Sequence, residues 1–225
     1  MSFCQNWDQL YRSNQHMSVW PWSEVVSGAL RNTRLRDGDE TFTILEVGCG
    51  AGANFPFFLS YCPNVYGIDG SDFIIGELKK RFSDIADNLY VGDFTQPWPF
   101  EAQFDLIVDR GASVHNPASS IQRYLEQAYD RLKPGGVILI TDWFSTEHSD
   151  YAKAPESVDH YTKTGYTWGP FADVGNVNFF DAELIHQLVA KFDIVSLSHG
   201  QSSEYGSDGV HAAWSMVLKK PAHEE

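Results

Sequence analysis

The sequence predicts an α/β protein built on a doubly wound, seven-stranded, mostly parallel sheet with an antiparallel last strand and helices on both faces. From residue 43 onward, short β-branched and apolar runs alternate with stretches of helical periodicity. This is the order expected when parallel strands are joined by crossover helices. The last two strand-like runs are joined by a segment too short for a crossover helix, so the final strand should run antiparallel.

The strands are read from short runs of apolar and β-branched residues between turn signals. The run FDLIVD is nearly all apolar, which fits a strand buried on both faces. The strands are predicted at 43–47, 64–69, 89–91, 104–109, 137–141, 192–198 and 211–219.

The helices between these strands carry recognisable start and stop signals. Pro56 lies in the first turn of a helix predicted at 53–61, where proline is tolerated. Ser71 can cap the helical stretch 73–82 through its hydroxyl. Asn116 and Pro117 are predicted as the N-cap and first residue of a helix that runs to about 132, where Lys-Pro-Gly-Gly breaks it. Asp181 is predicted to open the last helix, to about residue 191.

Two segments lie outside this alternation. Residues 1–40 are expected to form an N-terminal helical extension that acts as a cap, followed by the main domain at 41–225. The stretch at about 143–180 is rich in Tyr, Trp, Phe and Gly and is predicted to be irregular. Long loops of this kind are usually functional, so this insertion is the expected cover of a substrate site.

Composition excludes several classes of partner. The 16 basic and 30 acidic residues give a formal charge of −14, which repels phosphate backbones, so nucleic acid is not an expected partner. The three cysteines form no CxxC pair, so no metal site is expected, and they fit a reducing cytosol. No apolar run reaches 18 residues, and the polar N-terminus lacks a signal-peptide core. A cytoplasmic protein that does not enter the membrane is therefore expected.

The strongest chemical signal is the run Glu-Val-Gly-Cys-Gly-Ala-Gly at 46–52. Glycines between a first strand and a helix let the backbone turn tightly and approach a ligand. Gly48, Gly50 and Ala53 also satisfy the dinucleotide fingerprint, so an NAD(P)-dependent oxidoreductase is the alternative prediction. Asp69 follows the first glycine by 21 residues and could accept bonds from ribose hydroxyls in either class.

Further motifs separate the two classes. An acid lies two residues before the first glycine, and five further motifs follow along the chain: GIDGS, VGDFTQ, FDLIVDRGASVHN, LKPGG before VILITD, and the terminal HAAWSMVLKK. Together they resemble the motifs of the class I, Rossmann-like S-adenosylmethionine-dependent methyltransferases. The resemblance covers residues 40–142 strongly and 181–220 weakly. It implies an enzyme that transfers a methyl group from S-adenosylmethionine.

The resemblance also implies roles for individual residues in cofactor binding. Acids after successive strands would hold the cationic amino group, the ribose hydroxyls and the adenine, while glycines would border the methionine and ribose. Tyr11 is a candidate for the methionine carboxylate, and Trp20, with Trp22, would close the site. The implied cofactor-binding residues are Glu46, Gly48, Gly50, Gly52, Asp69, Gly70, Ser71, Asp93, Phe94, Asp109, Arg110, Tyr11 and Trp20.

The methyl acceptor is expected to be a small molecule, methylated on oxygen or nitrogen. A general base is needed only if the acceptor is protonated at neutral pH. His115, Asp142 and His148 are the candidates, ahead of His160, His199 and His211. Three stretches, VWPWSEVV, GAGANFPFFLS and DWFSTEHSDY, resemble methyltransferases of bacterial surface polysaccharides and small metabolites, which implies a sugar or nucleotide-linked acceptor. The acceptor atom, the use of a base and the oligomeric state stay open.

Overall fold

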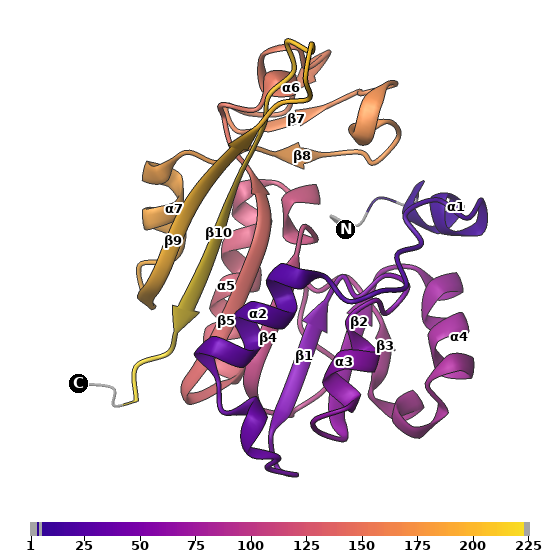
Figure 1. Cartoon of the computed structure of the whole chain (residues 1–225). Coiled ribbons are helices and arrows are strands. Elements are labelled where there is room, and N and C mark those ends of the chain that lie inside the picture. Colours follow the sequence, from indigo (N-terminus) through magenta and orange to yellow (C-terminus); the bar gives the residue numbers. More distant parts are fainter. Residues whose placement is uncertain (1–3, 5, 223–225) are drawn as a thin grey trace.

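The computed structural model, which describes residue 4 and residues 6–222, has one large sheet with strand order β3-β2-β1-β4-β5-β10-β9 (Figure 1). The first five strands pair in parallel, and β10 pairs antiparallel with both β5 and β9. The predicted seven-stranded, doubly wound fold with an antiparallel last strand is confirmed. The strands are β1 (Thr43–Val47), β2 (Asn64–Asp69), β3 (Leu89–Val91), β4 (Phe104–Arg110), β5 (Leu132–Phe144), β9 (Asp193–Ser202) and β10 (His211–Lys219).

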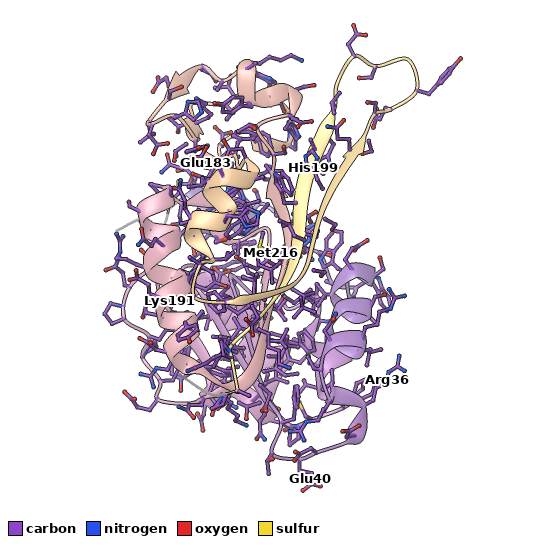
Figure 2. All side chains as sticks on the ribbon, turned by 90° about the vertical axis from the view of Figure 1, so that its left-hand side faces the viewer. Arg36, Glu40, Glu183, Lys191, His199 and Met216 are labelled. Carbon is purple, nitrogen blue, oxygen red and sulfur yellow. The ribbon has the colours of Figure 1, made fainter. Side chains whose placement is uncertain are left out.

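Helices cover both faces of this sheet, as the side view in Figure 2 shows. The helices α2 (Ser23–Asn32), α3 (Phe55–Leu59) and α4 (Asp72–Arg81) bury apolar side chains in one core, and α5 (Ala118–Arg131) and α7 (Ala182–Leu188) in the other. Alternate residues of β4 enter opposite cores, because successive side chains of a strand point to opposite faces. Leu106 and Val108 face one core and Ile107 faces the other.

Two of the predicted helix caps are confirmed and one is wrong. Ser71 accepts from the Ile74 amide at 3.2 Å, and Asp181 accepts from the Leu184 amide at 2.8 Å. Helix α5, however, begins one residue later than predicted, because Pro117 is itself the extended N-cap residue. The Asn116 side chain instead donates to the Ser113 carbonyl at 3.3 Å, within the short helix η3 (Ser113–His115).

The start of β5 also differs from the prediction. The Lys-Pro-Gly-Gly segment is not outside the strand, because its backbone is held beside the end of β10. The Gly135 amide donates to the Lys220 carbonyl at 3.0 Å, and the Lys220 amide donates to the Gly136 carbonyl at 2.9 Å. The strand consequently begins at Leu132 rather than at 137.

The insertion at 143–180 is not irregular throughout, contrary to the prediction. It contains α6 (Ser149–Ala152), the short helix η4 (Gly169–Phe171) and a three-stranded antiparallel sheet. Strands of two or three residues are too short to produce a period-two sequence pattern, which is why the sequence did not reveal them. They are β6 (Glu156–Ser157), β7 (Thr162–Thr164) and β8 (Val177–Asn178).

The N-terminal segment contains two helices, one packed on the sheet and one beside the insertion. Helix α2 packs on the sheet, with Val25 and Ala29 fully buried. Helix α1 (Asn6–Arg12) lies beside the insertion in Figure 1 and shares a small apolar core with it, through Leu10. Asp8 fixes α1 to the start of α4 by accepting from the Ser71 hydroxyl at 2.7 Å. Residues 1–3 and 5 of the predicted extension, and 223–225 of the main domain, lie outside the described residues.

The remaining helices of the described chain are η1 (Leu35–Asp37) and η2 (Ser83–Asn88). Among all the helices in the described part of the chain, none has the length and apolar character needed to cross a bilayer.

Candidate active site

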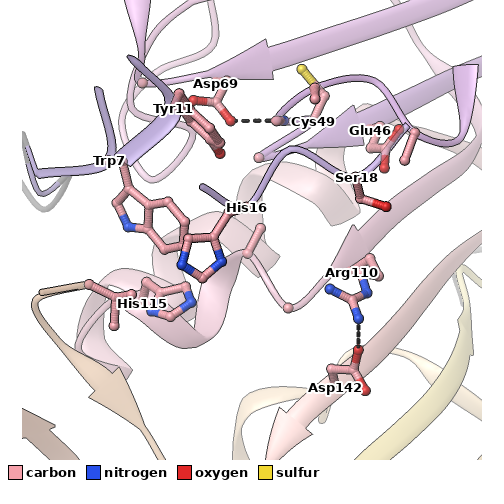
Figure 3. Close-up of a pocket in the computed structure, with 18 of the residues that line it drawn as sticks. Trp7, Tyr11, His16, Ser18, Glu46, Cys49, Asp69, Arg110, His115 and Asp142 are labelled. Carbon is pink, nitrogen blue, oxygen red and sulfur yellow. Dashed lines mark hydrogen bonds and ion pairs between the residues drawn. The ribbon is translucent and has the colours of Figure 1, made fainter. Parts of the chain in front are cut away.

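A cavity of about 660 Å³ lies where the parallel strands end, beneath α1 and the insertion (Figure 3). In open α/β sheets, ligands bind outside the carboxyl ends of the strands, and ligand pockets typically measure about 300–1,000 Å³. The charged residues that line this cavity are Glu46, Asp69, Asp93, Arg110 and Asp142.

The glycine loop after β1 forms the floor of the pocket. Gly48 has φ +58° and Gly50 has φ +49°, both in the left-handed region that side chains disfavour. A Cβ atom on Gly48 would lie 2.3 Å from the Cβ of Ala112, in the loop after β4. Glycine is therefore required at this position by both backbone conformation and space.

Asp69, the last residue of β2, lines the pocket next to this loop. Its carboxylate accepts from the Gly50 amide at 3.0 Å and from the Ser71 amide at 2.9 Å. The Tyr11 hydroxyl of α1 lies close to the same carboxylate and favours its ionised form. Burial outweighs these bonds and raises the pKa of Asp69 to about 6.

Glu46 lies in β1 and is 4% exposed. Its Oε1 accepts from Asn54 Nδ2 at 2.7 Å, and Asn54 in turn accepts from the Trp22 amide at 3.0 Å. Its Oε2 has no hydrogen-bond partner among the described residues. Burial raises the pKa of Glu46 to about 8. A cationic ligand in the pocket would satisfy Oε2 and favour the ionised carboxylate.

Asp93 and Phe94 line the pocket from the loop after β3. The Asp93 carboxylate accepts from the Thr95 amide at 3.0 Å and from its hydroxyl at 2.7 Å, which fixes its orientation. The Phe94 ring packs edge-on against Tyr124, with ring centroids 5.4 Å apart. An acid and an apolar ring thus lie together on one wall.

Arg110 is the last residue of β4, and Asp142 lies near the end of β5. Their side chains form an ion pair at 2.8 Å, which is visible in Figure 3. The Arg110 guanidinium also lies over the Trp22 ring, 3.5 Å from its centroid. Among the described residues that line the pocket, Arg110 is the only Lys or Arg, and its charge is already paired.

Four residues predicted to bind the cofactor do not line the pocket: Asp109, Gly52, Ser71 and Trp20. Asp109 is fully buried and holds the turn after β4 by accepting from the Ala112 and Ser113 amides, both at 3.1 Å. The Gly52 α-carbon faces Leu78 and aromatic rings of the core, and Ser71 is used as the cap of α4. Trp20 is 80% exposed, and its near neighbour Trp22 lines the pocket instead.

The other predicted cofactor-binding residues all line the pocket: Tyr11, Glu46, Gly48, Gly50, Asp69, Gly70, Asp93, Phe94 and Arg110. The three candidate bases, His115, Asp142 and His148, line it as well. The structure therefore brings the residues proposed for the methyl donor and those proposed for the methyl acceptor to one cavity.

Several lining residues were not identified from the sequence. Trp7 and His16 come from the N-terminal segment, and Trp7 packs edge-on against His115 with centroids 4.8 Å apart. Trp7 and Tyr11 are four residues apart on α1, so helical spacing could have linked them. His16 and Asn54 carry no local signal of their role, because only the tertiary fold brings them to the pocket. Phe171 belongs to the aromatic stretch that was predicted to cover the substrate site.

No group of three or more His, Cys, Asp or Glu side chains in the described parts of the chain is arranged to hold a metal ion. Metal-independent catalysis stays a prediction. Turnover is expected to persist in excess EDTA, measured against a matched assay without chelator. Loss of turnover that added Mg²⁺ restores would contradict it.

The sequence is similar to those of known methyltransferases. Residues 44–136 match the methyltransferase domain family. The phosphoethanolamine N-methyltransferase of Plasmodium falciparum is 28% identical over 134 residues, which cover 56% of this chain and 50% of that protein. The chain spans half or less of the length of the first curated relatives that it matches.

Solved structures share the fold over nearly the whole chain. An S-adenosylmethionine-dependent methyltransferase from Methanosarcina mazei superposes with a TM-score of 0.67 at 14% identity, covering 91% of this chain and 100% of the other. The N-methyltransferase NodS of Bradyrhizobium japonicum, in complex with S-adenosyl-L-homocysteine, superposes with a TM-score of 0.61 at 16% identity, covering 97% and 100%. A segment of the chain, residues 44–136, thus matches the methyltransferase domain family, and the chain as a whole shares the fold of these S-adenosylmethionine-dependent methyltransferases.

Proposed function

We propose that this protein binds S-adenosylmethionine in the pocket and transfers its methyl group to an oxygen or nitrogen of a small molecule. The observation that carries the proposal is Oε2 of Glu46, a buried oxygen without a partner among the described residues, on a residue that lines the cavity. A buried carboxylate oxygen of this kind favours a positively charged ligand group.

The lining residues fit the groups of this cofactor. Glu46 would hold the amino group, Asp69 the ribose hydroxyls, and Asp93 the adenine amino group. The glycine loop lets the ligand approach the backbone closely, since Gly48 and Gly50 present no side chain. Tyr11, which is 7% exposed, would cover the ligand from α1.

When bound, the cofactor supplies an electrophilic methyl group on a good leaving group. The protein then needs to hold the acceptor atom about 3 Å from that methyl, in line and away from water. The α1 helix and the insertion serve this purpose, because they pack on each other above the strand ends.

The oxidoreductase alternative gains no support from the comparisons. A dinucleotide would bring its pyrophosphate to the glycine loop, where Glu46 and Asp69 are buried. Neither acid can pair with the pyrophosphate, and the charge of Arg110 is already paired with Asp142. The same excess of acids, with the net charge of −14, supports the prediction that the acceptor is a small molecule rather than a nucleic acid.

Two measurements test the proposed function. Calorimetry should detect binding of S-adenosylmethionine and of its demethylated product. Incubation with isotopically labelled methyl donor and a metabolite extract, followed by mass spectrometry, should yield a labelled small molecule. If the purified protein binds neither nucleoside at millimolar concentration, the proposal is wrong.

Replacing Asp69 with Ala is expected to weaken cofactor binding by about 1–3 kcal/mol, because charge-assisted hydrogen bonds are lost. The matched control is Asp72→Ala, three residues away on the exposed first turn of α4. The control should bind the cofactor as the unmodified protein does. Equal affinities of the two variants in calorimetry would remove Asp69 from the site.

A further inference from the structure

Two histidines in the pocket present ring nitrogens that have no hydrogen-bond partner among residues 6–222. His115 follows β4, and His148 lies in the insertion, and both line the cavity. All the hydrogen bonds that the structure gives to these rings are made by Nδ1. Nε2 of each ring is therefore left for a ligand.

The partner of Nδ1 determines the state of the His115 ring. Nδ1 lies 3.1 Å from the backbone carbonyl of Asn176. A carbonyl oxygen can only accept, so Nδ1 must carry the proton of the neutral ring. Nε2 of His115 consequently offers a lone pair and accepts hydrogen bonds.

His148 has the opposite arrangement. Its Nδ1 accepts from the Asp150 amide at 3.1 Å, as the N-cap of α6. An amide can only donate, so in the neutral ring the proton is on Nε2. His148 is 7% exposed and packs against Phe144 and Phe171, so its Nε2–H is a donor among aromatic rings.

The walls around these two rings are mainly aromatic, and their other titratable members are His16, which packs against Trp7, and His211, which packs against His148. Trp7 packs edge-on against His115, and Phe144 and Phe171 pack edge-on at 4.8 Å between centroids. Val174, also in the pocket lining, is 1% exposed. Among the described residues that line the pocket, the one Lys or Arg is Arg110, and its guanidinium is held by Asp142, so the lining offers no unpaired cation of this kind to a phosphate or carboxylate. Desolvating an anion in such surroundings would be unfavourable.

We propose that the methyl acceptor is an uncharged molecule with a planar ring, whose hydroxyl donates to Nε2 of His115 and whose second, hydrogen-bond-accepting oxygen binds Nε2–H of His148. The proposal rests on the proposed function and specifies its acceptor. It disfavours nucleotide-linked sugars, which carry a pyrophosphate. It also separates the roles of the two histidines: His148 is a hydrogen-bond donor, and His115 is the acceptor that orients the reacting hydroxyl.

The methyl transfer needs only the acceptor hydroxyl, the methyl donor and His115. The hydroxyl oxygen forms the new O–C bond while the C–S bond of the donor breaks and leaves its electron pair on sulfur. The hydroxyl proton leaves along its hydrogen bond to His115 and passes to solvent. Because burial lowers the pKa of His115 to about 4, its ring is neutral and accepting at neutral pH. Burial also lowers the pKa of His148, which keeps that ring neutral.

Three matched sets of probes test the proposal on the complex with S-adenosylhomocysteine. Hydroxybenzaldehydes carry both oxygens, cresols replace the formyl group with a methyl group, and hydroxybenzoates replace it with an anion. The ortho, meta and para isomers sample different separations of the two oxygens. At least one hydroxybenzaldehyde should bind three- to tenfold more tightly than its cresol, and the hydroxybenzoates and uridine diphosphate glucose should bind more weakly still.

Variants then assign the contacts. His148→Phe should abolish the advantage of the aldehyde over the cresol, and His115→Phe should weaken both probes. His148→Asn, whose side-chain oxygen can still cap α6, controls for folding of the insertion. His115→Gln, whose amide oxygen can still accept, should recover part of the binding that His115→Phe loses.

The proposal is overturned if a hydroxybenzoate or uridine diphosphate glucose binds as tightly as the aldehydes, or if His148→Phe weakens aldehyde and cresol equally. It is also overturned if no uncharged probe binds at millimolar concentration while S-adenosylhomocysteine still binds. That last result leaves the proposed cofactor intact, whereas failure to bind S-adenosylhomocysteine would contradict the proposed function itself.

Discussion

Replacing Glu46 with Gln should stabilise the empty protein and, at the same time, remove most of its affinity for S-adenosylmethionine. Glu46 is buried, and one carboxylate oxygen has no partner in the described chain, so ionising it in the empty pocket is unfavourable. The bound cofactor supplies the missing cation. Gln presents an amide donor to that cation instead, and the loss of a charge-assisted bond corresponds to about 10- to 100-fold in affinity.

The stability gain depends on pH in a defined direction. The pKa of Glu46 is raised from 4.5 to about 8, so between these values the folded state binds more protons than the unfolded state. Stability therefore falls as pH rises through this window, and the full cost is present only above the folded pKa. Glu46→Gln should add roughly 1–3 kcal/mol of stability at pH 7, because its own unpaired amide retains part of the cost, and should add nothing below pH 4.5.

Urea denaturation of the empty protein across pH 4–9 and calorimetric titration with the donor measure the two effects. Calorimetry at pH 7 in buffers of different ionisation enthalpy should also detect proton release on binding, since Glu46 is mostly protonated in the empty pocket. Glu40→Gln, an exposed substitution before β1 (Figure 2), is the matched control and should change neither property. Unchanged donor affinity in Glu46→Gln would remove this residue from the site.

The second large effect is expected at Gly48. Gly48→Ala should destabilise the protein by about 2–5 kcal/mol, combining a left-handed backbone cost of about 1–2 kcal/mol with overpacking of about 1–3 kcal/mol. The overpacking arises because the new Cβ would meet the Ala112 Cβ at 2.3 Å, and both atoms are fixed to backbone. Donor binding should fall as well, because the loop that floors the pocket must move.

Gly38 offers a matched control, with φ +67° and no atom within 4 Å of an added Cβ. Gly38→Ala should show the backbone cost alone and leave donor binding intact. The double variant Gly48→Ala with Ala112→Gly should recover the overpacking part, because the next Ala112 atom, Cα, is 3.5 Å away. If denaturation gives equal losses at the two glycines, or the double variant shows no recovery, the close packing of this loop on the β4 loop is wrong.

The cofactor side of the pocket could be predicted from the sequence because its residues belong to local patterns. Glu46 and the glycines lie at and after the end of one strand, and Asp69 and Asp93 lie at and after the ends of the next two. The rules for connecting parallel strands bring those ends to one edge of the sheet. Asp109 shows the limit of this reasoning, since its position at a strand end was read correctly but its side chain turns inward to bond Ser113 and Trp143.

The sequence by itself determined the strands, the antiparallel end of the sheet and the acids at its carboxyl edge, because hydrophobic periodicity and turn residues act over short distances along the chain. Only the tertiary structure decided what faces those acids. Trp7 meets His115 across more than a hundred residues, and α1 packs on an insertion whose strands are too short to leave a pattern. The opposite polarity of His115 and His148 arises in the same way, because each ring takes its state from the backbone group that the fold places beside Nδ1.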